Sequence, residues 1–353
     1  KGWFNLTNPF RGTIVIGTPE SGKSYSIIMP FIRQSLSKNF TGLVYDYKYP
    51  DLTELTYFQY LKNKKRTNGI KNMSFHVVNL DNVEYSRRVN PLLPKYIDSL
   101  ASAIETAGAL VNSLSKRSEA SEGGASAFFS QSAINFLAAT FFFFSKYELG
   151  KYSTLPHVLS FLNKEYDEIF DVLLSEPELE SLLSPFVSAH KTGTYQQLEG
   201  QIGTLRIHLG KLNTKESAWV FSDNDVDLRI SNKSCPSVFV IANSPKTEAT
   251  NSTINSLLLN TLTKQINTKG NYPCAVIIDE LPTIFFYKIQ NLISTARSNK
   301  VAVMLGFQEL PQLVEGYGKQ IADTITSVVG NVISGGVKNK DTLMWLERLF
   351  GKS

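Results

Sequence analysis

Apolar runs alternate with stretches of helical periodicity toward both ends of the chain, and this alternation predicts strands joined by helices. The run at 236–242 is continuous, which is typical of a parallel strand covered on both faces. We expect helices between the runs, including one over 250–268 and one that continues through Arg297. The predicted strands are 13–16, 42–46, 74–80, 236–242, 274–280, 301–308 and 331–334.

The pattern changes between about Lys95 and Lys211, where helical periodicity continues and no strand is predicted. Small polar residues and glycines at 116–126 predict a mobile loop, and Thr154 ahead of Pro156 predicts a helix start. Strands on both sides of a helical segment indicate an α/β fold, a doubly wound and mostly parallel sheet with an inserted all-α domain. We place the sheet domain at 1–94 and 213–353, and the insert at 95–212.

The most apolar stretch lies between Ala127 and Phe144, although polar residues interrupt its first half. A membrane-spanning helix needs ~20 mostly apolar residues, so a buried core helix is the better interpretation. The four phenylalanines at 141–144 are expected in that helical core, with a partner surface as the alternative. We expect the chain to be a soluble piece of a longer protein.

Composition adds modest limits. The 353 residues are 42% hydrophobic and 19% charged, which allows a sizeable core in one large domain or two ordinary ones. The net charge of +5 permits contact with nucleic acid or an anionic membrane but requires neither. Cys235 and Cys274 form no metal or disulfide pattern, which fits a reducing cytosol. The four histidines are scattered, so no metal site is predicted from them.

The strongest chemical signal is a loop between a predicted strand and a predicted helix. It reads Gly17-Thr18-Pro19-Glu20-Ser21-Gly22-Lys23-Ser24 and continues into Tyr25. A G-x-x-x-x-G-K-S pattern in this context is a phosphate-binding loop. Its glycines let successive N–H groups point at phosphates, and the helix dipole adds positive potential. We therefore expect residues 17–25 to bind a nucleoside triphosphate.

Two side chains at the end of this loop have distinct expected roles. Lys23 reaches the β- and γ-phosphates, and the Ser24 hydroxyl coordinates Mg²⁺. The expected ligands are therefore ATP and Mg²⁺. Pro30 interrupts the helix predicted from about Gly22 to Ser37, because an interior proline removes a hydrogen bond and kinks the helix.

A second signal is the pair of acids, Asp279 and Glu280, that ends a predicted apolar strand. In a chain with a phosphate-binding loop, such a pair forms a Walker B element. Asp279 is expected to hold Mg²⁺, and Glu280 to orient and deprotonate the attacking water. A pair of acids favours hydrolysis over simple nucleotide binding.

Further residues are candidates for the same site. Gln308 ends the next strand, where a polar side chain can sense the γ-phosphate. Arg297 is either an ordinary helix cation or a finger that reaches a neighbouring subunit's phosphate. Asp46 and Lys48 follow another strand and are expected near the nucleotide, with a surface ion pair as the alternative.

These residues together resemble the conjugative type IV coupling proteins, the TraG/TraD-like DNA-pumping ATPases of bacterial conjugation. The resemblance spans about Gly12 to Gly351. It rests on the phosphate loop with Ile28-Met29-Pro30, on Asp46-Tyr47-Lys48, Asn90-Pro91-Leu92 and Asp279-Glu280, and on Arg297, Gln308, Gln312-Leu313 and Tyr317-Gly318.

The resemblance implies a RecA-like P-loop NTPase domain with a cytosol-facing all-α domain. It implies that Asp279 and Glu280 are the family's acids, that Arg297 is its arginine finger and that Gln308 is its glutamine sensor. Single-stranded DNA, a relaxase or relaxosome and a type IV secretion channel are the implied partners of a homo-hexamer. Its location would be the cytoplasmic face of the inner membrane, through an N-terminal anchor that this chain lacks; the family also usually continues past this C-terminus.

Two other functions stay open at this point. One is an FtsK/HerA-like ring translocase that pumps duplex DNA or protein without conjugation. The other is a nucleotide-switched adaptor whose helical insert docks secretion substrates. Stimulation of the ATPase by single-stranded DNA distinguishes the motor from the adaptor, because a motor predicts marked and salt-sensitive stimulation.

Overall fold

The computed structural model describes residues 5–115 and 124–351, which fold into two compact units. The first unit comprises Lys1–Asp81, Asp227–Glu248 and Leu262–Ser353, and the second comprises Asn82–Val226 and Ala249–Thr261. The segment 95–212, expected as an insert, falls within the second unit.

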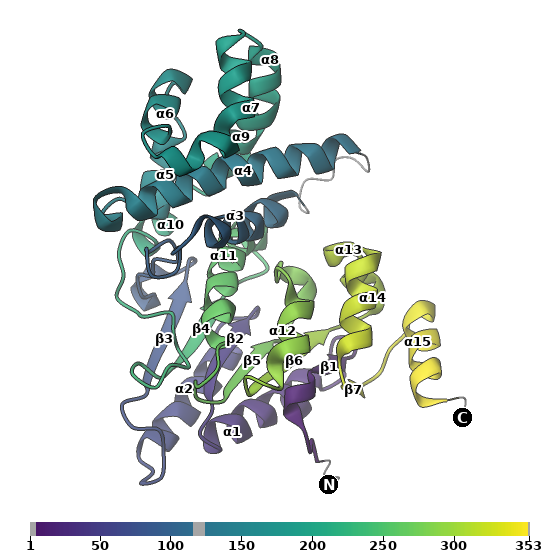
Figure 1. Ribbon diagram of the computed structural model, residues 1–353. Helices are drawn as coiled ribbons and strands as arrows, with labels where there is room; N and C mark the ends of the chain where they lie inside the picture. The colour runs from purple at the N-terminus through teal and green to yellow at the C-terminus, as the bar shows by residue number, and fades with distance from the viewer. Residues whose placement is uncertain (1–4, 116–123, 352–353) are drawn as a thin grey trace. The chain divides into compact units, whose positions relative to one another are not determined.

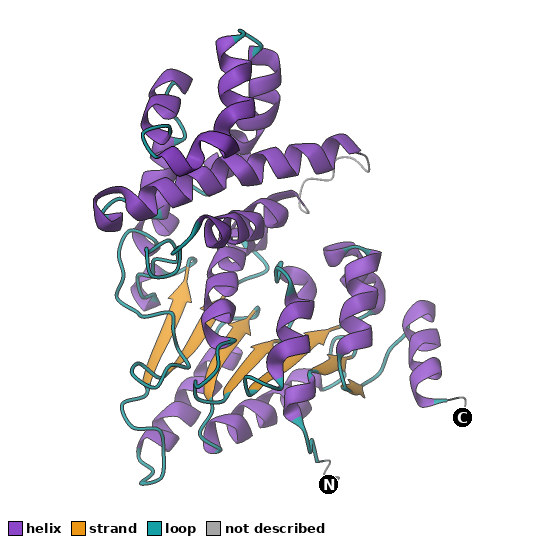
Figure 2. Cartoon of the chain, in the orientation of Figure 1, coloured by secondary structure: helices purple, strands orange, loops and turns teal. Residues whose placement is uncertain are grey.

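The described part of the first unit contains a seven-stranded sheet in which every pairing is parallel (Figures 1 and 2). The strand order is β3-β4-β2-β5-β6-β1-β7. This confirms the predicted doubly wound α/β sheet. The strands are β1 (Thr13–Ile16), β2 (Thr41–Asp46), β3 (Ser74–Asn79), β4 (Ser237–Ala242), β5 (Cys274–Ile278), β6 (Val301–Phe307) and β7 (Asn331–Ser334).

Helices cover both faces of this sheet. The connection from β1 to β2 runs in the opposite direction along the sheet from the connection of β5 to β6, so right-handed crossovers place their helices on opposite faces. The helices are α1 (Met29–Ser37), α2 (Asp51–Lys64), α11 (Glu248–Ile266), α12 (Ile289–Ala296), α13 (Leu310–Tyr317), α14 (Lys319–Val328) and α15 (Lys340–Phe350). Helix α11 is continuous, and its central residues belong to the second unit.

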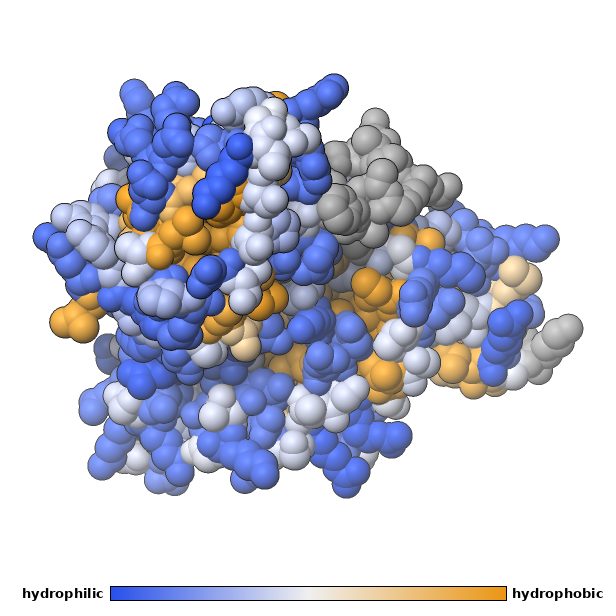
Figure 3. All heavy atoms as spheres, turned by 45° about the horizontal axis from the view of Figure 1, so that its top comes forward, coloured by the Kyte–Doolittle hydropathy of each residue, from blue (hydrophilic) through white to orange (hydrophobic). Residues whose placement is uncertain are grey.

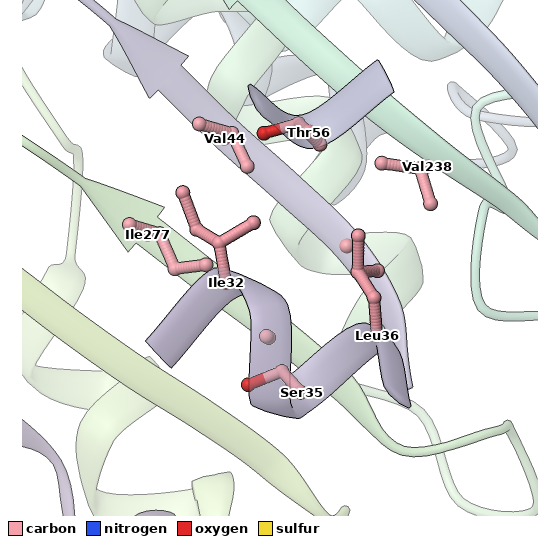
Figure 4. Close-up of a pocket in the computed structure, with 9 residues that line it drawn as sticks. Ile32, Ser35, Leu36, Val44, Thr56, Val238 and Ile277 are labelled. Atoms are coloured by element: carbon pink, nitrogen blue, oxygen red, sulfur yellow. The ribbon is translucent and has the colours of Figure 1, made fainter. Parts of the chain in front are cut away.

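The core beneath α1 is tightly packed. On the inner face of α1, Ile32 points at Val44 of β2 and Ile277 of β5, and Leu36 lies on the side of Val238 of β4 (Figure 4). The space between them is too small to admit a water molecule. We therefore regard it as core packing that fixes α1, and with it the loop that precedes α1, against the sheet.

The described residues of the second unit form helices joined by turns and loops, with no strand among them. Its helices are α3 (Leu100–Ser115), α4 (Gly124–Lys146), α5 (Leu155–Phe161), α6 (Tyr166–Leu173), α7 (Glu180–Lys191), α8 (Tyr195–Leu198), α9 (Thr204–Gly210) and α10 (Lys215–Val220). The phenylalanines at 141–144 are buried, as expected for a helical core. Thr154 caps α5 by accepting a hydrogen bond from the His157 N–H, as predicted. Among the described helices, none combines the length and the apolar character that a membrane crossing requires.

The structure differs from the sequence prediction at several element boundaries. Residues 124–126 begin α4 instead of ending a loop, whereas 116–123 lie outside the described residues. The helix expected from Gly22 is a π-helical turn over Ser24–Ile28 followed by α1, so Pro30 lies in the first turn of α1, where proline is tolerated. Helices α10, α13, α14 and α15 were not predicted.

Helix α15 differs from the other helices of the first unit in its surface. Leu343, Met344, Leu349 and Phe350 are all exposed on it, and apolar atoms are visible in its region at the right of Figure 3. Its amino end is fixed nevertheless. Asn339 caps it by accepting hydrogen bonds from the N–H groups of Asp341 and Thr342.

Candidate nucleotide site

The loop after β1 is held at the carboxyl edge of the sheet by contacts with distant parts of the chain. The Gly17 N–H donates to the Phe307 carbonyl of β6 at 3.3 Å. The Thr18 N–H and hydroxyl both donate to the Gly336 carbonyl, at 2.9 and 3.1 Å. The segment after β7 therefore anchors the start of the loop, although it lies more than three hundred residues further along the chain.

Glycine suits the backbone path at two positions of this loop. A Cβ atom on Gly17 would lie 2.5 Å from the Ser21 hydroxyl oxygen, so Ser21 would have to move to admit it. Gly22 has a φ of +83°, in the left-handed region that favours glycine. Pro19 and Glu20 form the exposed tip of the loop. The spacing of the two glycines thus follows from the backbone path.

Five side chains from the loop and two neighbouring strands meet at this edge. The Ser24 hydroxyl donates to Asp279 Oδ1 at 2.9 Å. The Lys23 ammonium donates to the Asp279 carbonyl at 3.3 Å and lies 3.4 Å from Glu280 Oε2. The Gln308 amide donates to the same Glu280 oxygen at 3.2 Å. The structure therefore brings the predicted loop, acids and glutamine into one cluster.

Strand order explains why residues so far apart in sequence converge. β6 lies between β5 and β1 in the sheet, and all three strands run parallel, so their carboxyl ends share one edge. Gly306 near the end of β6 permits a close approach there. A Cβ atom at Gly306 would lie only 2.2 Å from the Asp279 carbonyl oxygen.

Burial and neighbouring groups shift the pKa of Glu280. Glu280 and Asp279 are both 7% exposed. Burial raises the pKa of Glu280, while the Lys23 charge and the hydrogen bond from Gln308 oppose that rise. A carboxyl group with a raised pKa is better matched to accepting a proton near neutral pH than an ordinary glutamate.

Asp46 lies at the carboxyl end of β2, next to β5, and is fully buried. Its Oδ2 atom accepts hydrogen bonds from the N–H and the hydroxyl of Thr53, at 2.8 and 2.7 Å. Its pKa is raised to about 6, mainly by burial and also by the nearby charge of Asp279, against the effect of those hydrogen bonds. Lys48 is exposed. Asp46 therefore belongs to the interior and not to a surface ion pair with Lys48.

Arg297 lies at the other edge of the sheet. It follows α12, and its carbonyl accepts from the N–H of Lys300 at the start of β6. Asp279 and Gln308 follow the carboxyl ends of β5 and β6, whereas Arg297 lies near the amino end of β6. The length of the strand, roughly 20 Å, therefore separates Arg297 from the cluster. Arg297 is exposed, and its guanidinium group has no hydrogen-bond or ion-pair partner among the described residues.

Sequence reasoning missed several residues that shape the site. Gly306 had a readable signal, because a glycine inside an apolar strand often marks a close backbone approach. No sequence signal pointed to Thr283. Its hydroxyl donates to the Glu280 carbonyl at 2.7 Å and lies 3.1 Å from the Tyr45 hydroxyl, which fixes the backbone after Walker B.

The cluster offers oxygen ligands suited to a hard cation. Ser24 Oγ and Asp279 Oδ1 lie 2.9 Å apart, and hydroxyl and carboxylate oxygens are ligands that Mg²⁺ accepts together with phosphates and water. Elsewhere within 5–115 and 124–351, no group of three or more His, Cys, Asp or Glu side chains is arranged to hold a metal ion.

Comparison with protein families gives one match over the whole chain. The family model described as Type IV secretory system Conjugative DNA transfer matches residues 1–353. No curated protein sequence matches the chain.

Solved structures show the same fold at low sequence identity. The plasmid coupling protein TrwB in complex with the non-hydrolysable ATP analogue ADPNP matches with a TM-score of 0.65 and 12% identity, over 92% of this chain and 70% of that chain. TrwB in complex with ADP and Mg²⁺ matches with a TM-score of 0.65 and 13% identity, over 94% of this chain and 73% of that chain. VirB4 of Thermoanaerobacter pseudethanolicus matches with a TM-score of 0.57 and 10% identity, over 97% of this chain and 81% of that chain. The chain thus has the fold of these proteins.

Proposed function

The chain belongs to the family of type IV secretory system conjugative DNA transfer proteins, and on this premise we propose that it is an ATP-hydrolysing coupling protein. It links a relaxase–DNA complex to a type IV secretion channel and drives transfer of single-stranded DNA. The observation that carries the enzymatic part is the convergence of Lys23 and Ser24 with Asp279 and Glu280 at one edge of the sheet.

Nucleotide binding is supported by the loop itself and by the relatives. TrwB, which shares this fold, has been solved with an ATP analogue and with ADP and Mg²⁺. In this chain residues 17–25 would bind ATP, with its phosphates in the loop 17–24, and Ser24 and Asp279 would hold Mg²⁺. The metal ion, when bound, neutralises charge on the phosphates.

Hydrolysis is assigned to Glu280 as general base. A water oxygen attacks the γ-phosphorus, its proton passes to a Glu280 carboxylate oxygen, and the bond to the ADP oxygen breaks. Gln308 holds that carboxylate in place through its Oε2 atom, which Lys23 also contacts until phosphate competes for it. We also assign Gln308 to sense the γ-phosphate; its contact with the base and its position directly after β6, the strand beside β1, support this assignment.

Arg297 is proposed to act on a neighbouring subunit. The strand length between Arg297 and the cluster places it beyond reach of its own subunit's phosphates. An exposed cation without an internal partner among the described residues suits contact with a second copy of the chain. We therefore assign the working assembly as a ring of identical subunits, a homo-hexamer, in which each arginine completes the next site.

The partners and the location follow from the family. They are single-stranded DNA, a relaxase or relaxosome, and the secretion channel, at the cytoplasmic face of the inner membrane. The net charge of +5 is compatible with binding the DNA backbone.

The proposal is tested by measuring phosphate release from ATP with and without single-stranded DNA at several salt concentrations. We expect marked stimulation that weakens as salt rises. Glu280→Gln should abolish turnover while still binding ATP, Lys23→Ala should lose turnover, and the exposed Glu54→Gln should behave as wild type.

Three outcomes would contradict the proposal or one of its parts. ATP hydrolysis that ignores DNA would favour the nucleotide-switched adaptor. Stimulation by duplex DNA alone would favour the FtsK/HerA-like translocase. Normal turnover in Glu280→Gln would remove Glu280 as the base.

A further inference from the structure

A groove with a volume of about 810 Å³ runs beside the helix that follows the phosphate loop. Tyr25 and Ser26, directly after Ser24, line it at one end, and Lys38, just beyond the end of α1, lines it at the other. Thirteen helical residues span roughly 20 Å, so the groove is elongated and begins at the loop. Its volume lies within the roughly 300–1,000 Å³ of small-molecule sites.

The walls of the groove combine apolar and polar groups. Phe31, Phe40 and Met304 supply apolar surface, and Ser26 and Gln34 supply hydrogen-bonding groups. Such a mixture is typical of small-molecule sites, in which a few polar groups fix the orientation of the ligand.

Tyr25 is the outstanding side chain of this groove. It is 78% exposed, although tyrosine rings are usually at least partly covered. It follows the proposed Mg²⁺ ligand Ser24 by one residue, and it lies in the π-helical turn Ser24–Ile28. Short π-helical segments inside helices occur frequently at functional sites.

Pro30 gives that turn a second unusual property. Proline has no N–H group, so it cannot donate to the carbonyl oxygens four and five positions earlier. Those carbonyls belong to Ser26 and Tyr25, both of which line the groove. The turn therefore has one intrahelical donor fewer on the side where a ligand would lie.

We propose that the Tyr25 end of this groove binds the base and ribose of the nucleotide, with the Tyr25 ring stacked on the base. The inference rests on the proposed nucleotide binding by the phosphate loop. Phosphates held by the N–H groups of the loop leave the nucleoside to continue away from it, and the groove opens one residue beyond Ser24.

Stacking also sets the expected specificity. Every nucleobase has a π-face, so stacking on an aromatic ring tolerates different bases. With Tyr25 as the main contact, adenine and guanine nucleotides should bind with similar affinity. The phosphate loop would then determine that a triphosphate binds, and the groove would add affinity for any nucleoside.

The test compares ATP, GTP and inorganic tripolyphosphate, each with Mg²⁺, by titration calorimetry. Tyr25→Ala should weaken ATP and GTP binding by roughly tenfold and leave tripolyphosphate binding unchanged. Tyr25→Phe should restore nucleotide affinity, because it keeps the ring. Tyr85→Ala, which removes another exposed tyrosine, is the matched control and should change nothing.

The outcomes separate this inference from the proposed function. If wild-type protein binds ATP but Tyr25→Ala loses no affinity, or loses it equally for tripolyphosphate, the base does not stack on Tyr25. If wild-type protein binds neither ATP nor tripolyphosphate, the nucleotide site itself is wrong. Lys23→Ala should weaken both ligands together, which identifies the contribution of the loop.

Discussion

Gln308 donates a 3.2 Å hydrogen bond to Oε2 of Glu280, the same oxygen that lies 3.4 Å from the Lys23 ammonium. Both contacts lower the pKa of Glu280, against the larger effect of burial, which raises it. The two neighbours differ in what a bound nucleotide would do to them. Phosphate would compete for Lys23, whereas the amide of Gln308 would remain available to the carboxylate.

This relationship predicts a pH dependence for Gln308→Ala. Glu280 accepts a proton only when it is ionised, so turnover falls as pH drops through its pKa. Loss of the hydrogen bond from Gln308 raises that pKa. The acid limb of the rate profile should therefore move to higher pH in the variant, measured by single-turnover hydrolysis at saturating ATP.

The exposed Gln320 provides the control for this measurement. Gln320→Ala should keep the wild-type acid limb. An unchanged limb in Gln308→Ala would mean that the hydrogen bond is absent in the nucleotide-bound protein, and a uniform loss of rate at all pH values would give Gln308 another role.

Asp46→Asn is predicted to change how stability depends on pH. The folded protein holds the Asp46 proton more tightly than the unfolded chain, because its pKa is raised from 3.8 to about 6. The stability from this proton is fully present below pH 3.8 and is lost as pH rises through about 6. At 1.36 kcal/mol for each pH unit, the loss is about 3 kcal/mol.

Asparagine keeps an oxygen that can accept from Thr53 but carries no titrating proton. The difference in unfolding free energy between wild type and Asp46→Asn, measured in denaturant at several pH values, should therefore shift in favour of the variant between pH 4 and pH 6. A constant difference across this range would show that Asp46 titrates normally.

The sheet and most residues of the candidate site could be predicted from the sequence, because the motifs lie next to recognisable strands. The loop at 17–24 and the acids at 279–280 each sit at the end of an apolar strand, and parallel strands bring such ends to one edge. The anchoring of Thr18 by Gly336 could not be predicted, because it depends on β7 pairing beside β1. The position of Arg297 at the opposite edge likewise was not predicted, because it depends on the direction in which α12 runs.

Gly306→Ala is predicted to disturb the site through the backbone. The added methyl group would lie 2.2 Å from the Asp279 carbonyl oxygen, which accepts a hydrogen bond from Lys23. The strands must shift to relieve this contact. Overpacking of this kind typically costs about 1–3 kcal/mol, and we expect weaker ATP binding in addition.

Thermal unfolding and ATP titration measure the two effects of Gly306→Ala. Gly210→Ala is the matched control, since a Cβ atom there meets nothing within 4 Å and the residue is helical. Wild-type stability and affinity in Gly306→Ala would show that the sheet edge adapts without cost, and that the glycine is not needed for the approach of β5.

Arg297 gives a prediction about the assembly. If it stabilises charge on a neighbouring subunit's nucleotide, Arg297→Ala should lower turnover by ~10³ without weakening ATP binding to its own loop. Lys23→Ala is the complementary defect, because it damages the loop and keeps the arginine. A mixed ring then contains interfaces where an intact loop from one variant faces an intact Arg297 from the other.

Co-assembly of the two inactive variants should therefore restore part of the activity in single-stranded-DNA-stimulated hydrolysis. The control is a mixture of Lys23→Ala with Lys71→Ala, a substitution at an exposed residue that should leave the subunit active. It measures how activity changes when active subunits are diluted with Lys23→Ala subunits. If the Arg297→Ala and Lys23→Ala mixture only averages the two separate activities, while native mass spectrometry shows mixed rings, the arginine does not act between subunits. Because roughly 20 Å of strand separates Arg297 from its own phosphate loop, that result would leave it without a role in hydrolysis.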